Sequence, residues 1–369
     1  MNKFNGACLS FLVCAGLLFF SCSDFYNDLK NSGAQVVTPA TSPAPTQTPA
    51  TDPEPAPTPT STPSPSSAAS GAYTKIGTQT INGVDYDIVT FGLWPQTRKA
   101  ENVTVDKNET ESHGIFTYCK GSDEEWYFEA GRDDWFKVEP IKWRVLTTNY
   151  NGTGNKLLLA ETILESIEYY YYNYSDIYRT INGKTVYPNN YEHSKVRAFL
   201  NGLSYKKNND YMVDGNLVHT QVDCDDYLGK GFLHSAFTDV EQSLIVTTEV
   251  NNGQRTTNPD DNATLWNGGN NPYASDMSTN DKIFLLSEQE ITKKEFGFSA
   301  YDQDGPDKTR ARNTTDYATE AYLGWWLRSP CCDKNSRARS IWITEGKANS
   351  NFGVNDCNGG IVPALCVAN

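Results

Sequence analysis

A stretch from Gln35 to Ser70 consists almost entirely of Pro, Thr, Ser and Ala. Such a segment cannot bury enough apolar surface to offset the entropy lost on ordering, so it cannot form a packed core. Its proline content predicts an extended, semi-rigid spacer. Folded structure must therefore come from residues 71–369, which are rich in Tyr, Trp and Phe and long enough for one large domain.

The residues before this spacer have the pattern of an export signal. Lys3 precedes an apolar run from Ala7 to Phe20, about 14 residues and shorter than the roughly 20 that cross a membrane. The run closes on Ser21-Cys22, which resembles a bacterial lipobox. An ordinary signal peptide cut nearby, or a buried helix, is the alternative.

We therefore expect a lipoprotein signal peptide at 1–21, a lipidated N-terminus at 22–34 and a stalk at 35–70. On this interpretation Cys22 carries the lipid, palmitate included, and holds the protein at the cell surface or outer membrane. The stalk then holds residues 71–369 away from the membrane.

The charge and the motifs exclude several classes of function. The net charge of −14 argues against binding to nucleic acid or to anionic membrane surfaces. We find no P-loop, no dinucleotide-binding fingerprint and no HExxH zinc motif. His113, His193, His219 and His234 are scattered without the spacing of metal ligands, so we predict no metal or cofactor site.

Strand and helix patterns alternate with long loops along 71–369, which predicts an α+β fold. Asn82-Gly83 predicts a hairpin, and 141–146 and 156–160 predict a second strand pair. A helix is expected within 191–202. Capping-box spacing begins another helix after Thr238 and recurs at 287–290. In the helix after Thr238 we expect three residues to face inward: Val240, Leu244 and Ile245.

Two apolar, turn-rich blocks lie near the C-terminus: GWWLRSP at 324–330 and GGIVPALC at 359–366. They bracket a stretch, 331–358, without a single chemical theme. A core needs apolar residues at fixed periods, whereas a recognition surface needs varied side chains on a fixed frame. We expect the blocks to form a buried frame that includes Trp325, Trp326, Leu327, Pro330, Pro363, Leu365 and Cys366.

Several blocks occur together in order: FGLWPQ at 91–96, IKWRVL at 141–146, SKVRAFLN at 194–201, DKIFLLS at 281–287, GWWLRSP and VPAL at 362–365. Together they resemble the variable proteins of diversity-generating retroelements, surface lipoproteins of Treponema among them. The resemblance implies a C-type lectin-like fold of the formylglycine-generating-enzyme subclass over 71–369, with long loops and insertions. It also implies a variable region at about 331–358.

The resemblance further implies a function. Such a protein is a non-enzymatic receptor or adhesin without a cofactor, and its variable face binds a protein or glycan of a host or a microbe. The alternative is a cysteine oxidase resembling the formylglycine-generating enzyme, which would use cysteines of the same fold. A passive cell-envelope protein is a third possibility.

In the variable proteins a reverse transcriptase rewrites adenines of a C-terminal repeat, mainly at Asn codons. Replacing both adenines of AAC gives a set of residue types that includes Cys, Ser, Asp, Phe and Thr. The positions that fit this set are Cys331, Cys332, Asp333, Ser336, Ser340, Thr344, Ser350, Phe352, Asp356 and Cys357. Trp342 and Glu345 fall outside it, so whether these two vary stays open.

Strand alternation in 340–344 points the same way. Ile341 and Ile343 would pack on one side, while Ser340, Trp342 and Thr344 would be exposed on the other. A partly exposed Trp beside small polar residues is typical of an interface anchor, and a core aromatic is the alternative. We therefore predict that Trp342 and the ten AAC-compatible positions form one continuous exposed ligand-binding patch.

The adjacent Cys331-Cys332 also fits a metal or redox site. A disulfide between neighbouring residues is strained, and no C-x-x-C partner lies nearby, so two recognition positions are favoured. Cys119 and Cys224 are candidates for a disulfide in an exported protein, but the sequence does not establish the pair.

An acidic turn at 302–307 resembles a calcium-binding loop. Asp302, Asp304 and Asp307 surround Gly305, but the distant bidentate Glu of a helix-loop-helix calcium site is absent from the motif. An acidic surface turn is therefore the favoured interpretation.

Overall fold

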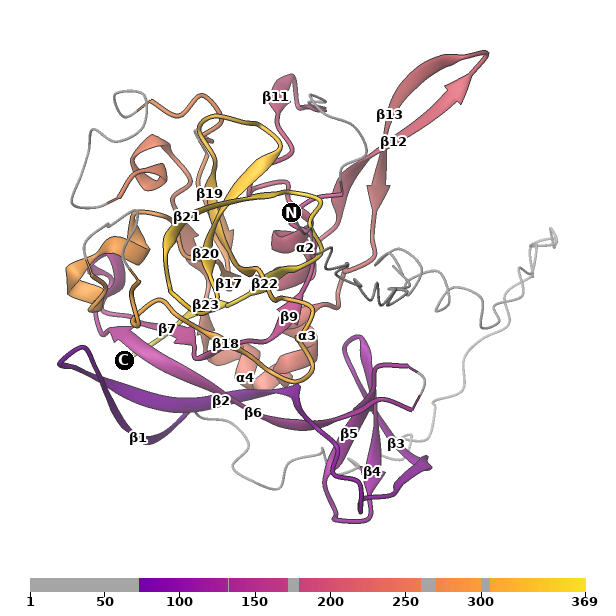
Figure 1. Cartoon of the computed structure of the whole chain (residues 1–369), viewed down its shortest axis with the longest axis vertical. Coiled ribbons are helices and arrows are strands. Elements are labelled where there is room, and N and C mark those ends of the chain that lie inside the picture. Colours follow the sequence, from indigo (N-terminus) through magenta and orange to yellow (C-terminus); the bar gives the residue numbers. More distant parts are fainter. Residues whose placement is uncertain (1–72, 132, 172–178, 260–269, 276, 300–305) are drawn as a thin grey trace, which may run out of the picture. The chain divides into compact units, whose positions relative to one another are not determined.

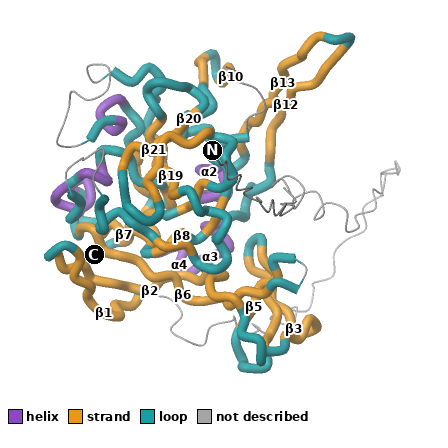
Figure 2. The backbone as a smooth tube through the Cα atoms, viewed as in Figure 1, coloured by secondary structure: helices purple, strands orange, loops and turns teal. Residues whose placement is uncertain are grey.

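Strands dominate the structure, a computed structural model that describes residues 73–131, 133–171, 179–259, 270–275, 277–299 and 306–369 (Figure 1). The helices are few and short (Figure 2). The predicted α+β balance is thus shifted toward β. The signal peptide, the stalk and Cys22 lie outside the described residues. Within the described ranges, no helix has the length and apolar character needed to cross a membrane.

The larger sheet has ten strands, all paired antiparallel, and it curls into a half-barrel. The path runs β14-β23-β7-β6-β5-β4-β3; β2 pairs with β6 and β1, and β17 pairs with β23. The strands are β1 (Thr74–Ile81), β2 (Val84–Arg98), β3 (Val105–His113), β4 (Phe116–Gly121), β5 (Trp126–Glu129), β6 (Trp135–Thr147), β7 (Lys156–Ala160), β14 (Ile245–Val246), β17 (Ile283–Phe284) and β23 (Ala364–Val367).

The second sheet has five strands in the order β21-β20-β19-β22-β9 and carries the C-terminal stretch. β19 pairs antiparallel with β20 and parallel with β22. The strands are β9 (Glu165–Ser166), β19 (Gly324–Pro330), β20 (Arg337–Trp342), β21 (Ala348–Gly353) and β22 (Gly359–Ile361).

Smaller elements connect and surround the two sheets. One hairpin of β12 and β13 extends away from the rest of the domain (Figure 1). The remaining strands are β8 (Thr162–Ile163), β10 (Arg179–Ile181), β11 (Lys184–Val186), β12 (Tyr205–Val213), β13 (Asn216–Cys224), β15 (Thr248–Val250), β16 (Thr279–Asp281) and β18 (Asn313–Thr314). The helices are α2 (Lys195–Asn201), α3 (Phe232–Ala236) and α4 (Asp239–Leu244), with 3-10 turns η1 (Tyr150–Gly152), η2 (Gln254–Thr257), η4 (Glu290–Thr292) and η5 (Lys294–Phe296).

Local sequence signals place the turns and helix ends well. Asn82 and Gly83 both have positive φ angles and join β1 to β2, as a two-residue hairpin requires. The strand pair of β6 and β7 is confirmed. Ser194 caps α2 by accepting a hydrogen bond from the Arg197 N–H, and Gly202 ends it in the left-handed conformation.

The prediction for α4 is partly wrong. Thr238 and Glu241 form the expected capping box, and Ile245 is buried. Val240 and Leu244, however, are exposed. The helix is only 6 residues long and none of its residues is buried, so its apolar spacing does not face the core.

The predicted buried frame is confirmed. Trp325, Trp326 and Leu327 are fully buried in the main core cluster with Leu365 and Cys366. Pro330 and Pro363 are buried as well. The two C-terminal blocks therefore belong to the interior rather than to the surface.

The disulfide left open by the sequence does not form. Cys119 and Cys224 are both buried free thiols. Cys119 packs in a small separate cluster with Tyr127 and Trp135, whereas Cys224 belongs to the main core.

Candidate functional site

The frame beneath the C-terminal stretch is held by buried tryptophans. The Trp326 Nε1–H donates to the Ile167 carbonyl at 2.9 Å, and its ring contacts Tyr169 and Phe352 edge-on, with centroids 5.4 and 5.6 Å apart. The Trp325 Nε1–H donates to the Arg310 carbonyl at 3.2 Å. Both indoles thus satisfy their only polar group inside the core, as buried Trp requires.

Two glycines allow β19, β20 and β22 to approach each other. A Cβ on Gly324, whose φ is +153°, would lie 2.0 Å from the Ile341 carbonyl oxygen. A Cβ on Gly359 would lie 2.2 Å from the Trp326 ring. Gly324 is paired with Trp342 on one side and with Gly359 on the other, so these three positions lie together at one end of the sheet.

The predicted binding positions differ widely in exposure. Asp333, Trp342 and Thr344 are exposed, and Ser336, Asp356 and Cys357 are partly buried. The side chain of Ser350 lies outside what the structure describes, although its backbone pairs with Ser340. The prediction that all these side chains are exposed is wrong for four of them: Cys331, Cys332, Ser340 and Phe352 are buried.

The segment that follows β9 is bonded to the C-terminal stretch. The Tyr170 N–H donates to the Val354 carbonyl at 2.8 Å. The Asn189 side-chain amide donates to the carbonyls of Lys334 and Arg337 at 3.1 and 3.0 Å. These contacts fasten the segment to the C-terminal stretch, so strand alternation alone does not decide which face of the sheet meets water.

Three of the positions that are not fully buried flank β20 in the sequence. Asp333 and Ser336 lie in the loop before β20, whereas Thr344 lies in the turn after it, closed by a Gly346 N–H bond to the Trp342 carbonyl. Whether these positions join in one continuous patch with Asp356 and Cys357 stays a prediction.

An aromatic surface remains at the end of β20. We define the aromatic rim as Tyr322, Trp342, Thr344 and Asn358. Trp342 is 42% exposed and Tyr322 58% exposed. The Trp342 ring rests edge-on against buried Phe352 with centroids 5.8 Å apart, which fixes the indole while leaving part of it open to solvent.

Asn358 connects the rim to the loop before β19. The Tyr322 hydroxyl donates to Asn358 Oδ1 at 3.4 Å, and Asn358 Nδ2 donates to the Glu320 carbonyl at 3.0 Å. Neither Tyr322 nor Asn358 was among the predicted residues. Asn358 lies within the stretch 331–358 that the sequence singled out, whereas no sequence signal marks Tyr322.

The chemistry at Cys331 and Cys332 is that of protected thiols. Burial raises the pKa of Cys331 to about 11 and also raises the pKa of Cys332. The Cys331 Sγ–H donates to Asp333 Oδ1 at 2.6 Å. Since the thiolate is the nucleophile and metal ligand, both side chains are in their unreactive form near neutral pH.

Of the acidic turn, Asp307 belongs to the described residues, whereas Asp302 and Asp304 lie outside them. The Asp307 carboxylate is buried, accepts from the Ser299 and Thr309 N–H groups, and lies 3.2 Å from Arg310 Nη2. Its oxygens thus hold the loop together. In the described part of the chain, no group of three or more His, Cys, Asp or Glu side chains is arranged to hold a metal ion.

Comparison with known proteins assigns the C-terminal part of the chain. Residues 153–369, more than half of the sequence, match the profile of a domain of unknown function, DUF6273. The chain belongs to the DUF6273 family. No curated protein and no solved structure matches it. The DUF6273 region contains the whole five-stranded sheet, the buried frame and the aromatic rim.

Proposed function

We propose that this chain is a surface-displayed ligand-binding protein, a receptor or adhesin, whose C-terminal face recognises a protein or glycan. The proposal includes a C-type lectin-like fold of the formylglycine-generating-enzyme subclass and diversification of 331–358 by a retroelement. Among such proteins the sequence blocks resemble most the Treponema surface lipoprotein TvpA.

The observation that carries the proposal is the aromatic rim on a rigid support. Trp342 is part-exposed and backed by Phe352, which in turn packs on fully buried Trp326. Aromatic side chains held in this way supply contact area at low entropic cost and dominate many binding interfaces. Thr344, two residues after Trp342, and Asn358, which is bonded to Tyr322, supply hydrogen-bonding groups.

The burial of four predicted positions narrows the variable surface. We propose that recognition uses Asp333, Ser336, Trp342, Thr344, Asp356 and Cys357, joined by Tyr322 and Asn358. Substitution at Cys331, Cys332, Ser340 or Phe352 would instead alter the packing beneath that surface.

The alternative function, a cysteine oxidase, needs a reactive thiolate. The raised pKa values of Cys331 and Cys332 weigh against this chemistry. Binding therefore remains the favoured proposal.

The diversification part is tested in the genome. We expect a near-identical copy of the DNA that encodes 331–358, differing only at adenines of the copy, beside a reverse transcriptase gene. A locus without either feature would remove diversification from the proposal while leaving ligand binding open.

The binding part is tested with residues 71–369 of the chain and a variant carrying Tyr322→Ala and Trp342→Ala. Both proteins are applied to glycan arrays and to intact host and microbial cells. We expect the first protein to bind a defined target and the variant to lose that binding with an unchanged melting temperature. Equal binding by the two proteins would remove the aromatic rim as the site.

The proposed lipid anchor is tested separately. Metabolic labelling with palmitate should tag the full chain, and Cys22→Ala should abolish the label and release the protein from membranes. Equal labelling of the variant would refute the assignment of Cys22.

A further inference from the structure

One buried side chain bonds the loop between β19 and β20, residues 331–336. Asn189 lies in the segment between β11 and α2 and is fully buried. Its Nδ2 donates to the carbonyls of Lys334 and Arg337 at 3.1 and 3.0 Å. A longer contact of 3.4 Å joins the same nitrogen to the Cys331 carbonyl. The side-chain amide of one residue outside the C-terminal stretch thus reaches both ends of the loop.

The bonds from Asn189 to the loop end on backbone carbonyls. Its own backbone N–H donates to the Asn335 carbonyl at 3.1 Å. The loop adds a bond between backbone groups, from the Cys331 N–H to the Arg337 carbonyl at 3.0 Å. Every residue type carries a backbone carbonyl, so these bonds do not depend on which side chains the loop bears.

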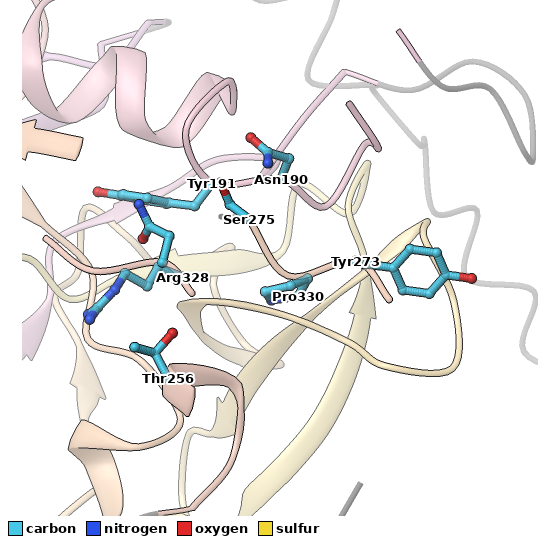
Figure 3. A pocket seen from close by; sticks show the side chains of 8 residues that line it. Asn190, Tyr191, Thr256, Tyr273, Ser275, Arg328 and Pro330 are labelled. Atoms are coloured by element: carbon cyan, nitrogen blue, oxygen red, sulfur yellow. The ribbon is translucent and has the colours of Figure 1, made fainter. Parts of the chain in front are cut away.

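Asn189 is held in position by neighbouring residues. Arg179, which is also fully buried, donates from Nη2 to the Tyr187 carbonyl at 3.1 Å. Asn190, the next residue of the chain, lines the same small cavity as Pro330, the residue that precedes the loop (Figure 3). The segment that carries Asn189 and the end of β19 therefore lie side by side.

We propose that Asn189 is a positioning residue that fixes the backbone of the loop whatever side chains the exposed loop positions carry. Asp333, which is exposed, and Ser336, which is half-buried, can then change while the loop keeps its shape. The importance of these two positions for recognition rests on the proposed function. The positioning is measured without a ligand, so its failure and the failure of the proposed function are told apart.

Hydrogen exchange of the full chain, resolved to short peptides by mass spectrometry, tests the positioning. Asn189→Leu removes both amide donors at a similar volume, so the loop amides should exchange about tenfold faster or more. Asn201→Leu is the matched control, because Asn201 Nδ2 bonds the Arg197 and Ile283 carbonyls at 3.3 and 2.7 Å, where α2 meets β17. This control should not accelerate exchange in the loop beyond its effect on the whole domain.

A double variant, Asp333→Ala with Ser336→Ala, tests the independence from side chains. Exchange of the loop amides should stay within about threefold of the unmodified protein. Acceleration as large as in Asn189→Leu would show that the loop side chains hold the backbone, and would overturn the proposal.

Unchanged exchange of the loop in Asn189→Leu, or equal acceleration throughout the domain, would also overturn it. If this variant does not fold, Asn189→Ala, which cannot overpack the site, takes its place. Failure of both variants to fold would assign Asn189 to the stability of the whole domain rather than to the loop.

Discussion

Replacing Trp326 with alanine should destabilise the domain strongly, whereas the same change at Trp342 should not. Trp326 is fully buried, and Trp342 is 42% exposed. The two residues lie on neighbouring strands and both contact the ring of Phe352. They therefore form a matched pair that separates the buried frame from the aromatic rim.

The magnitude for Trp326→Ala follows from what is lost. Trp→Ala substitutions in cores cost about 3–5 kcal/mol through lost transfer free energy and a cavity. The Ile167 carbonyl also loses its 2.9 Å donor, which adds about 1 kcal/mol or more if water does not replace the indole. We expect a total of about 4–6 kcal/mol, a large part of the 5–15 kcal/mol that typically stabilises a domain.

The free energy of unfolding is measured for residues 71–369 and for each variant by urea unfolding. Tryptophan fluorescence and circular dichroism follow the transition. We expect the melting temperature of Trp326→Ala to fall by about 10 °C. Trp342→Ala should change the free energy of unfolding by no more than about 1 kcal/mol. Equal effects of the two substitutions, or an unchanged stability for Trp326→Ala, would refute the division into frame and rim.

Three further predictions concern other parts of the domain. Gly359→Ala should lower the free energy of unfolding by about 1–3 kcal/mol, because the added Cβ would lie 2.2 Å from the Trp326 ring and overpack the core. Gly77→Ala is the control, because a Cβ at Gly77 would have no heavy atom within 4 Å. Burial raises the pKa of Glu165 to about 7, so the folded state holds a proton that the unfolded state releases. The free energy of unfolding should therefore fall by at most about 3 kcal/mol as pH rises from about 4.5 to 7. Glu165→Gln should lose this pH dependence, as measured by urea unfolding at several pH values. The same pH dependence in the variant and the unmodified protein would contradict the prediction. A thiol reagent at pH 7 should modify Cys357 long before Cys331, because Cys357 is partly accessible and the pKa of Cys331 is raised to about 11. The labelled residues are identified by mass spectrometry. Labelling of Cys331 first would show that this thiol is reactive.

Local signals in the sequence determined much of the scaffold. Asn82-Gly83 specifies its hairpin because both residues tolerate positive φ angles. Ser194 and Gly202 mark the two ends of α2. The sequence predicts both ends, because capping depends only on nearby backbone groups. The apolar blocks around Trp325 and Leu365 were correctly predicted to be buried. Large apolar side chains in short runs between turns are stabilised by burial in a core.

The tertiary structure decided which side of the C-terminal sheet is covered. Strand alternation shows that neighbouring side chains point to opposite faces, but not what packs on either face. Contacts with segments distant in sequence settle that. Tyr170 and Asn189 are bonded to the C-terminal stretch, and Phe352 packs on Trp326. Ser340 and Phe352 are buried as a result of the fold, not of alternation. Exposure depends on such long-range packing. The sequence therefore located the frame and the exposed Trp342, while only the fold buried Ser340 and Phe352 and brought Tyr322 into contact with Asn358.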